Sequence, residues 1–278
     1  MSDIAVITGT THGIGRVTSR ELAKAGRTVV MLCRDAAAAN LVREEVLAAV
    51  PGASIHVVQC DLATLASVRE AAQVVRRDFG RIGLLINNAG IAPSRHQISA
   101  DGFELTFATN HLGPFLLTRL LLDRIDSPGR IINVASRVHY RGTLDLDRVA
   151  NAKARFNPMA AYAQSKLANV LHAFALARRL AGTQVTANCL HPGVVATNLL
   201  PRWLRAIKPL LSPALLDVER GAKTTLYLAL SPDMAGTSGR YFDEHQIAQP
   251  ASAAADSVLL QEALWAVSER WVNKTGSE

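Results

Sequence analysis

Short apolar runs alternate with amphipathic or Ala-rich segments along almost the whole chain. The runs are aliphatic, often β-branched, and of strand length, so they predict seven strands, the last of them weak. These strands are residues 4–8, 28–33, 54–60, 82–86, 130–135, 184–190 and 240–242. The segments between them predict helices. These helices are residues 15–25, 36–50, 65–79, 102–122, 159–181 and 219–230.

Continuous apolar strands that alternate with helices are typical of a parallel sheet covered by helices on both faces. Right-handed crossovers then give a doubly wound, Rossmann-type α/β sheet of about seven strands. No repeat, low-complexity tract or long polar linker interrupts the pattern, so we expect residues 1–278 to form a single domain. In such a sheet ligands bind beyond the carboxyl ends of the strands. The loops that follow the strands are therefore where function is expected.

Composition and charge narrow the class of protein. Apolar residues make up 49% and charged residues 19%, which is typical of a globular chain. No apolar run approaches the roughly 18 residues of a membrane span, and the N-terminus has no basic region or cleavage site. We therefore expect a cytoplasmic protein without stable membrane insertion. The net charge of +7 is dispersed, with no run of five basic residues, so nucleic acid is not an expected partner.

The three cysteines are an odd number and lie far apart, each at the end of an apolar run. They are Cys33, Cys60 and Cys189. Such spacing favours small buried thiols in a reducing compartment over disulfides. We predict no metal site.

The first strand is followed by TGTTHGIG, residues 8–15, which opens the first predicted helix. Gly9, Gly13 and Gly15 permit a tight turn and a close approach of backbone to a pyrophosphate. The N-terminus of the helix presents N–H groups and the positive end of its dipole to the phosphates. The loop therefore predicts a dinucleotide site; the alternative is a glycine turn that binds nothing.

Ser136, Tyr162 and Lys166 form a candidate catalytic group. Ser136 ends the fifth strand, where its hydroxyl can hydrogen-bond a substrate carbonyl. Tyr162 and Lys166 are four apart on a predicted helix and so share a face. An ammonium nearby favours the phenolate and should lower the pKa of Tyr162 from its usual value near 10. The alternatives are an ordinary helix pair and a serine that forms a turn.

Asn110 lies four residues before Pro114 on the predicted helix 102–122. Proline has no N–H, so the Asn110 carbonyl loses its helical partner. That carbonyl can bind a water that leads to the Lys166 ammonium. The alternative is a polar residue with an ordinary bond in the middle of a helix.

Six motifs in this order resemble the short-chain dehydrogenase/reductase family: TGxxxGIG, NNAG, Asn110, Ser136, YxxxK and Pro192-Gly193. Three longer passages resemble its retinol-dehydrogenase-like branch. They are ELAKAGRTVVMLCRD, TNHLGPFLLTRLLL and AYAQSKLANVLHAFALARRL. The resemblance implies that Asn110, Ser136, Tyr162 and Lys166 are the four catalytic residues. The rival epimerase and dehydratase class usually has TGxxGxxG spacing and a larger C-terminal substrate domain.

The resemblance also implies the cofactor contacts. Asp61 would accept from the adenine amino group, although a helix cap is an open alternative, and the NNAG turn would lie beside the adenosine ribose. The nicotinamide would lie over Pro192-Gly193, and Val195 and Thr197 would contact its carboxamide and the phosphates. The expected set is Gly9, Thr11, His12, Gly13, Ile14, Gly15, Arg34, Asp61, Leu62, Asn88, Ala89, Gly90, Tyr162, Lys166, Pro192, Gly193, Val195 and Thr197.

The end of the second strand indicates which nucleotide is used. The family's NAD-reading acid normally stands at the position of Cys33, which cannot make that bond. Arg34 follows and can fork onto the extra phosphate of NADP, with Thr11 and His12 as further polar contacts. Asp35 is better placed to cap the next helix. We therefore expect NADP(H) as cofactor, with NAD less favoured; an exposed Arg34 that touches nothing is the alternative.

Two segments are expected to shape a lipophilic substrate pocket. In residues 137–160, His139 and Tyr140 either contact substrate or only pack. Residues 198–219, within a predicted lid at 194–220, carry an apolar stripe broken by prolines. Basic residues on the other side also suit a helix that rests on lipid.

The sequence therefore predicts an NADP(H)-dependent oxidoreductase that interconverts an alcohol and a carbonyl on a small lipophilic substrate. The alternative is a non-catalytic, nucleotide-binding regulatory protein on the same fold, against which the four intact residues argue. Relatives often pair through the helices of Asn110 and Tyr162, so a homodimer or homotetramer is a further expectation.

Overall fold

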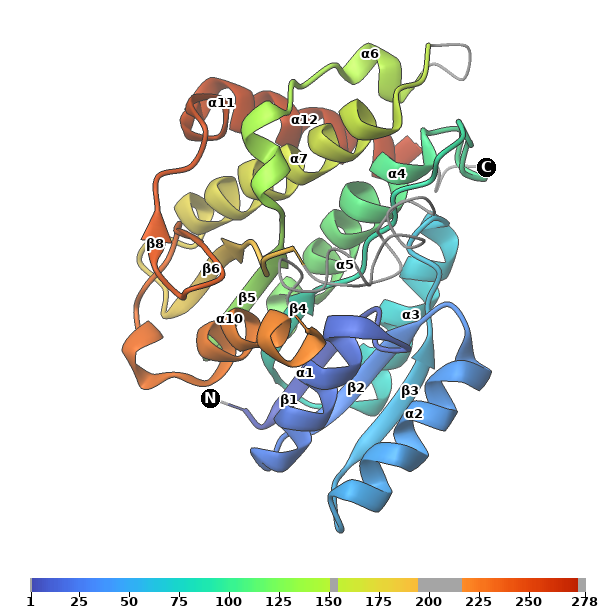
Figure 1. Ribbon diagram of the computed structural model, residues 1–278, viewed down its shortest axis with the longest axis vertical. Helices are drawn as coiled ribbons and strands as arrows, with labels where there is room; N and C mark the ends of the chain where they lie inside the picture. Colours follow the sequence, from blue (N-terminus) through green and yellow to red (C-terminus); the bar gives the residue numbers. More distant parts are fainter. Residues whose placement is uncertain (1, 151–154, 195–216, 275–278) are drawn as a thin grey trace.

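The sheet of the protein has eight strands in the order β3-β2-β1-β4-β5-β6-β7-β8 (Figure 1). The computed structural model describes residues 2–150, 155–194 and 217–274. The strands are β1 (Ile4–Thr8), β2 (Thr28–Cys33), β3 (Ile55–Gln59), β4 (Ile82–Asn87), β5 (Ile125–Val134), β6 (Val185–Leu190), β7 (Tyr241–Phe242) and β8 (Ala248–Gln249). All pairings are parallel except that of β7 with β8. The predicted doubly wound sheet is confirmed, with one strand more than expected.

The strand order reverses between β1 and β4, where β1 pairs with β4 through Ala5–Leu84 and Ile7–Ile86. On one side of this point the chain winds outward to β3, and on the other side to β7. The loops after β1 and β4 therefore emerge next to each other, at the place where sheets of this type bind ligands.

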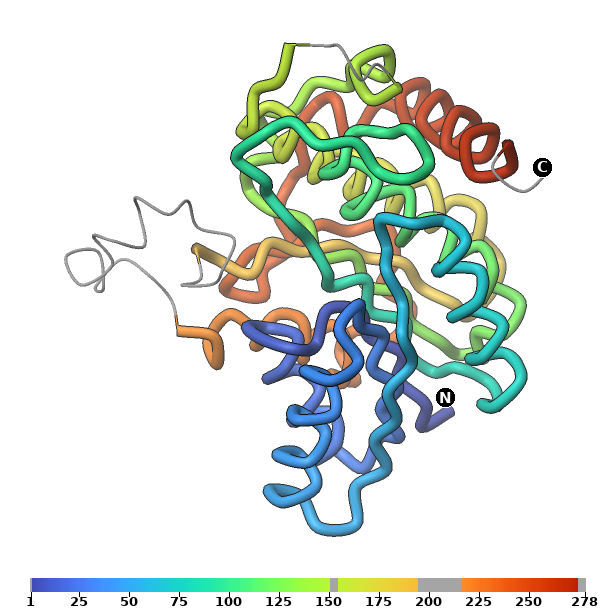
Figure 2. The backbone as a smooth tube through the Cα atoms, turned by 90° about the vertical axis from the view of Figure 1, so that its right-hand side faces the viewer, coloured from blue at the N-terminus to red at the C-terminus, as the bar shows by residue number. Residues whose placement is uncertain are grey.

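Helices cover both faces of the sheet (Figures 1 and 2). One face is covered by α1 (Gly13–Lys24), α2 (Ala36–Ala49) and α10 (Val218–Leu230), whose apolar residues join those of the strands in one core cluster. The other face is covered by α3 (Leu65–Asp78), α5 (Gly113–Leu121) and α7 (Pro158–Arg179), which form a second and larger cluster.

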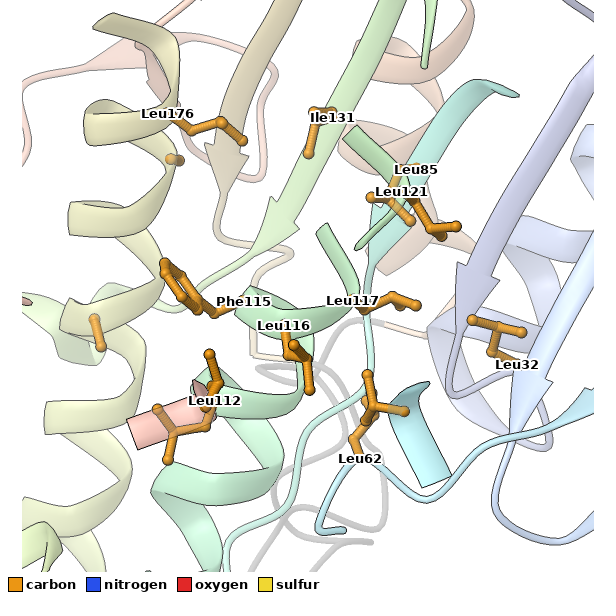
Figure 3. Packing of buried hydrophobic residues seen from close by; sticks show 14 of the residues in the cluster. Leu32, Leu62, Leu85, Leu112, Phe115, Leu116, Leu117, Leu121, Ile131 and Leu176 are labelled. Carbon is orange, nitrogen blue, oxygen red and sulfur yellow. The ribbon is translucent and has the colours of Figure 1, made fainter. Parts of the chain in front are cut away.

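The larger cluster centres on α5 (Figure 3). Phe115, Leu116 and Leu117 follow one another on α5, and each is at most 2% exposed. Three consecutive buried residues cannot lie on one helical face, so α5 is covered on several sides. The same holds for α7, where every residue from 163 to 173 is buried.

The second cover of these helices is α12 (Val258–Lys274), which the sequence did not predict. Its buried residues are Gln261, Leu264, Ser268 and Val272, at helical spacing. Two of the four are polar, which weakens the apolar period that would have indicated a helix. Trp265 of α12 packs edge-on against Phe115, with ring centroids 5.0 Å apart. The short helices α6 (Leu146–Val149) and α11 (Ala253–Asp256) were not predicted either.

The predicted helix 102–122 is divided into three parts. A single turn, α4 (Leu105–Phe107), leads into the π-helical turn η1 (Ala108–Leu112), which leads into α5. In η1 the Gly113 N–H bonds to Ala108 O, five residues back rather than four. The change of register comes just before Pro114, which cannot donate a backbone hydrogen bond.

Two of the predictions concern segments outside or beside the sheet. No helix in the described ranges is both long and apolar enough to cross a membrane. Of the predicted lid at 194–220, only residues 194 and 217–220 are among the described residues. The three short 3₁₀ turns are η2 (Leu122–Arg124), η3 (Arg137–Arg141) and η5 (Pro232–Met234).

Candidate active site

The glycine loop after β1 is tied to the turn after β4 by four hydrogen bonds. Thr8 Oγ1 accepts from the N–H of Asn88 at 3.1 Å and of Ala89 at 3.0 Å. The Asn88 side-chain amide donates to the carbonyls of Thr8 at 2.9 Å and Gly9 at 3.1 Å. The two predicted nucleotide loops are thus one unit. Thr8 was not predicted as part of it, although its place at the end of a strand beside a second loop was visible in the sequence.

The glycines of the loop are required by this close packing. Gly9 has φ +72°, and a Cβ there would lie 2.8 Å from the Ala89 Cα. A Cβ on Gly15 would collide with Gly9 O and with the Asn88 amide nitrogen. The same glycine–amide contacts leave a narrow, backbone-lined space, as the sequence predicted for a pyrophosphate.

The first turn of α1 lacks a side-chain cap. Gly13, Ile14 and Gly15 begin the helix, and the N-cap residue His12 makes no capping hydrogen bond. The His12 ring instead pairs with the Thr11 hydroxyl at 3.0 Å. Uncapped N–H groups at a helix N-terminus bind anions well.

The end of β2 carries Cys33 and Arg34, as the sequence predicted. Cys33 is buried, and its thiol lies 2.8 Å from the Thr10 hydroxyl. The side chain of Arg34 is exposed and forms no hydrogen bond or ion pair within the described residues. Asp35 caps α2 by accepting from the Ala38 N–H at 2.9 Å, which confirms the expected cap.

Asp61 and Leu62 follow β3. Asp61 accepts from the Ala63 N–H at 3.0 Å, and its own N–H donates to Ser67 Oγ at 3.0 Å. Asp61 therefore shapes a turn, and α3 receives its side-chain contact from the distant Asp101 instead. Leu62 is 6% exposed, and its backbone is in close contact with α5.

Asn110 lies on η1 and is fully buried. Its side-chain amide accepts from the Ile91 N–H at 2.8 Å and donates to Ile91 O at 3.0 Å. It also donates to Ser165 Oγ at 3.0 Å, and Ser165 in turn donates to Tyr162 O at 2.8 Å. Asn110 thus links the turn after β4 to α7. The side chain makes these links, whereas the predicted role of its carbonyl stays a prediction; Ser165 was not predicted at all.

Tyr162 and Lys166 lie on the same side of α7, with the Lys166 Nζ 5.6 Å from the centre of the Tyr162 ring. Lys166 is 2% exposed and donates to Val134 O at 2.9 Å. A Cβ on Gly90 would lie 3.3 Å from the Lys166 Nζ and 3.5 Å from the Asn110 Oδ1. The absent side chain of Gly90 therefore leaves room beside both polar groups.

Ser136 ends β5 and is 9% exposed. Its hydroxyl accepts from the Val138 N–H at 3.4 Å and forms a hydrogen bond with Tyr162. Ser136, Tyr162, Lys166 and Asn110 come from three separate parts of the chain and meet at one edge of the sheet. The structure therefore brings together all four of the residues that the sequence singled out.

Burial sets the pKa values in this group. It raises the pKa of Tyr162 to about 12, although the hydrogen bond with Ser136 works in the opposite direction. It lowers the pKa of Lys166 to about 8. The expected lowering of the tyrosine pKa by its lysine neighbour is thus not observed, because removal from water outweighs it.

Gly193 has φ +86°, a conformation that favours glycine, and so turns the chain after β6 and Pro192 as expected. Val195 and Thr197, predicted to contact the nicotinamide carboxamide and the phosphates, lie outside the described residues. His191 before this turn is 4% exposed, and neither of its ring nitrogens has a hydrogen-bond partner among the described residues.

His139 packs and does not face a pocket. It is fully buried, its ring lies 2.8 Å from Ser136 O, and it accepts from the Ser252 N–H at 3.3 Å. Tyr140 is 46% exposed, but its hydroxyl donates to Pro250 O at 2.5 Å. Of the two readings left open for His139, the packing one agrees with this geometry.

The chain matches the family model of the short chain dehydrogenases over residues 3–207. It is 41% identical to human retinol dehydrogenase 14, over 95% of this chain and 84% of that protein. It is 38% identical to the chloroplastic short-chain dehydrogenase TIC 32 B of Brassica napus, over 97% of this chain and 88% of that protein. The chain therefore belongs to the short-chain dehydrogenase/reductase family.

Among solved structures, one of an uncharacterised Mycobacterium paratuberculosis protein superposes with a TM-score of 0.80 at 34% identity, over 97% of this chain and 93% of that one. A blue fluorescent protein from a metagenomic library, in complex with NADPH, has a TM-score of 0.69 at 28% identity, over 86% and 95%. Within the family, the relatives place this chain in the retinol-dehydrogenase-like branch. It is thus an oxidoreductase of alcohols and carbonyls that uses a nicotinamide nucleotide.

The buried Lys166 ammonium should reduce the stability of the fold. Its pKa is depressed to about 8 from an ordinary value of 10.5, so the unfolded chain holds a proton that the folded chain releases between these values. Stability therefore rises with pH across this window, and below it the full penalty remains. We expect Lys166→Met to stabilise the protein at pH 7 by on the order of 2 kcal/mol, measured by urea unfolding.

The difference in stability between wild type and Lys166→Met should shrink as pH rises from about 8 to 10.5. A difference that does not change with pH would contradict a depressed lysine pKa. Lys223→Met, on α10, is the matched control, since that side chain is exposed and its variant should show no such pH dependence.

Proposed function

We propose that the protein interconverts an alcohol and a carbonyl on a small lipophilic substrate with NADP(H), and that Tyr162 transfers the proton. The observation that carries this proposal is the meeting of Ser136, Tyr162, Lys166 and Asn110 beside the space left by Gly90. These residues supply a hydroxyl donor, a phenol, an ammonium and an amide at one edge of the sheet, which is what hydride transfer to a carbonyl requires of a protein.

The residues around the glycine loop fit a dinucleotide. The uncapped first turn of α1 suits the pyrophosphate, and the space beside Gly90 borders Lys166 and Asn110. Gly9, Thr11, His12, Gly13, Ile14, Gly15, Asp61, Leu62, Asn88, Ala89, Pro192 and Gly193 would complete the contacts. Val195 and Thr197 stay predictions for the same site.

The end of β2 supports NADP over NAD. A carboxylate at the position of Cys33 would hold the ribose hydroxyls of NAD, but Cys33 is a buried thiol that is already bonded to Thr10. Arg34 is exposed, and its guanidinium is without a partner among the described residues, so it is available to a phosphate. The NADPH complex of the metagenomic relative agrees with this preference.

When bound, the nicotinamide supplies or accepts the hydride. Ser136 donates a hydrogen bond to the substrate oxygen and so polarises the carbonyl. The Tyr162 hydroxyl gives that oxygen its proton in reduction and takes it in oxidation. Lys166 holds its ammonium beside the Tyr162 ring, where it stabilises the phenolate form. Asn110 fixes the turn after β4 against α7, which keeps these groups aligned.

Two exposed apolar side chains support a lipophilic substrate. Met159, one turn before Tyr162 on α7, is 56% exposed, and Val194, directly after Gly193, is 52% exposed. Exposed apolar residues beside polar catalytic groups suit a substrate with one oxygen on a hydrocarbon. The retinol dehydrogenases among the relatives are named for such an alcohol. The lid at 194–220 and residence in the cytoplasm stay predictions.

Replacement of Tyr162 by Phe tests the proposal. The variant keeps the ring but has no proton to transfer, so we expect kcat with NADPH and a panel of lipophilic aldehydes to fall at least about 1,000-fold. The Kd for NADPH, followed by nucleotide fluorescence, should stay within about twofold. Turnover that survives in the variant would refute the mechanism. A wild-type protein that binds NADPH but reduces nothing in the panel would favour the regulatory alternative.

Replacement of Arg34 by Ala tests the nucleotide preference. Loss of the guanidinium should raise KM for NADPH about tenfold or more and leave KM for NADH nearly unchanged. Arg43→Ala, another arginine near this edge on α2, is the control and should alter neither. A wild-type enzyme that prefers NADH would overturn the assignment to NADP.

The covering of α5 and α7 bears on the expected homodimer or homotetramer. Residues 113–118 of α5 and 163–173 of α7 are all buried within one chain, so the middle of neither helix is open to a second copy. We therefore propose that the chain does not pair through these helices. Light scattering after size exclusion should give a mass near 29.8 kDa. A dimer that dissociates on substitution of exposed α7 residues would contradict this.

A further inference from the structure

Asn110 and its neighbour His111 connect the same π-helical turn to two different parts of the molecule. Asn110 reaches Ile91 and Ser165, on the side of the candidate active site. His111 reaches α12, where its Nε2 lies 2.9 Å from the Ser268 hydroxyl. The turn is thus held from the catalytic side by one residue and from the opposite side by the next.

The His111 ring is neutral and fixed in place. It is fully buried, and burial together with the neighbouring His172 lowers its pKa well below the ordinary value. Its Nδ1 has no hydrogen-bond partner among the described residues. An unpaired N–H donor costs more than an unpaired acceptor, so the proton belongs on Nε2, which donates to Ser268 Oγ.

Aromatic rings enclose the same imidazole. The Phe107 ring centroid lies 4.9 Å and the Phe115 centroid 5.8 Å from that of His111, and His172 lies edge-on at 5.9 Å. Ring contacts resist tilting but have little preference for one hydrogen-bond direction. The bond to Ser268 therefore supplies the directional restraint.

The helix that presents Ser268 is anchored at points on both sides of it. Glu262 pairs with Arg178 and Arg179 at 2.5 Å each, and the Arg179 guanidinium lies 3.9 Å from the Trp265 ring centre. Towards the other end, Trp271 packs against Phe103 at 5.1 Å. Ser268 is therefore a fixed point for the turn and not a mobile surface residue.

A π turn depends on such outside support. It places one residue more in the turn than an α-helix does, and the register change makes it less stable than the helix around it. A small rotation of η1 would carry Asn110 away from the Ile91 backbone, where both of its bonds are between 2.8 and 3.0 Å.

We propose that Ser268 and His111 are positioning residues: the Ser268–His111 hydrogen bond fixes the rotation of η1 and thereby aims the Asn110 side chain at Ile91 and Ser165. This inference rests on the proposed function, because it assumes that Asn110 supports proton transfer by Tyr162. It assigns to α12, far from Tyr162 in the sequence, a part in the rate of the reaction.

The test compares Ser268→Ala with the wild-type full-length enzyme. We expect kcat for carbonyl reduction to fall about tenfold, since small misalignments of catalytic groups have effects of this size. KM for substrate and the Kd for NADPH should stay within about twofold. The solvent deuterium isotope effect on kcat should increase, because proton transfer becomes slower. Ser268→Thr retains the hydroxyl and should restore both quantities to nearly wild-type values.

Glu262→Gln is the matched control on the same helix. It weakens the ion pairs of α12 with α7 but leaves the bond to His111 intact. It should lower thermal stability without changing kcat or the isotope effect. Equal losses of kcat in Glu262→Gln and Ser268→Ala would show general loosening of α12 and overturn the proposal. If Ser268→Ala does not fold, Ser268→Cys, which is nearly isosteric with a weaker hydrogen-bonding group, provides the same comparison.

Asn110→Ala separates this inference from the proposed function. If Asn110→Ala slows the reaction but Ser268→Ala does not, the positioning role is wrong and the proposed function stands. If neither variant changes kcat, the role of Asn110 itself is wrong. If both slow the reaction, the double variant should be no slower than Asn110→Ala alone, because both would act through the same side chain.

Discussion

The parallel pairing of β1 with β4 is the constraint on which the site depends. It brings the loops that follow the two strands to the same edge of the sheet, and there Thr8 and Asn88 bond them together. Every other candidate residue is placed relative to that unit. Asn110 bonds to Ile91, just beyond the turn, and Lys166 lies next to Gly90. Without the reversal of strand order these residues would belong to separate loops with nothing between them.

Sequence reasoning succeeded where a local signal has a local cause. The strands Ile4–Thr8 and Thr28–Cys33 were predicted to the residue, because each is a buried apolar run closed by a polar loop. The glycine loop, NNAG and the four candidate catalytic residues were found from their types and order. Their meeting in space follows from the sheet, since the residues come from segments that end at its carboxyl edge or cross it.

Sequence reasoning failed where the cause lies elsewhere in the chain. The helix α12 has Gln261 and Ser268 on its inward face, and only their buried partners explain why polar residues are there. Arg178 and Arg179 were expected to be solvated, yet both pair with Glu262. The π turn at Asn110 and the raised pKa of Tyr162 likewise depend on packing from distant segments, which no local pattern reveals.

The covering of α5 and α7 by α12 also has a consequence during synthesis. All eight strands precede α12 in the sequence, so the ribosome releases the sheet and its inner helices first. Until α12 emerges, the ring of Phe115 and the polar rings of His111 and His172 lack the side chains that enclose them in the finished fold. Such a partly covered intermediate exposes apolar surface and is prone to associate with other chains. Completion of the fold, and not formation of the sheet, is then the step at which a nascent chain of this protein most needs protection from aggregation.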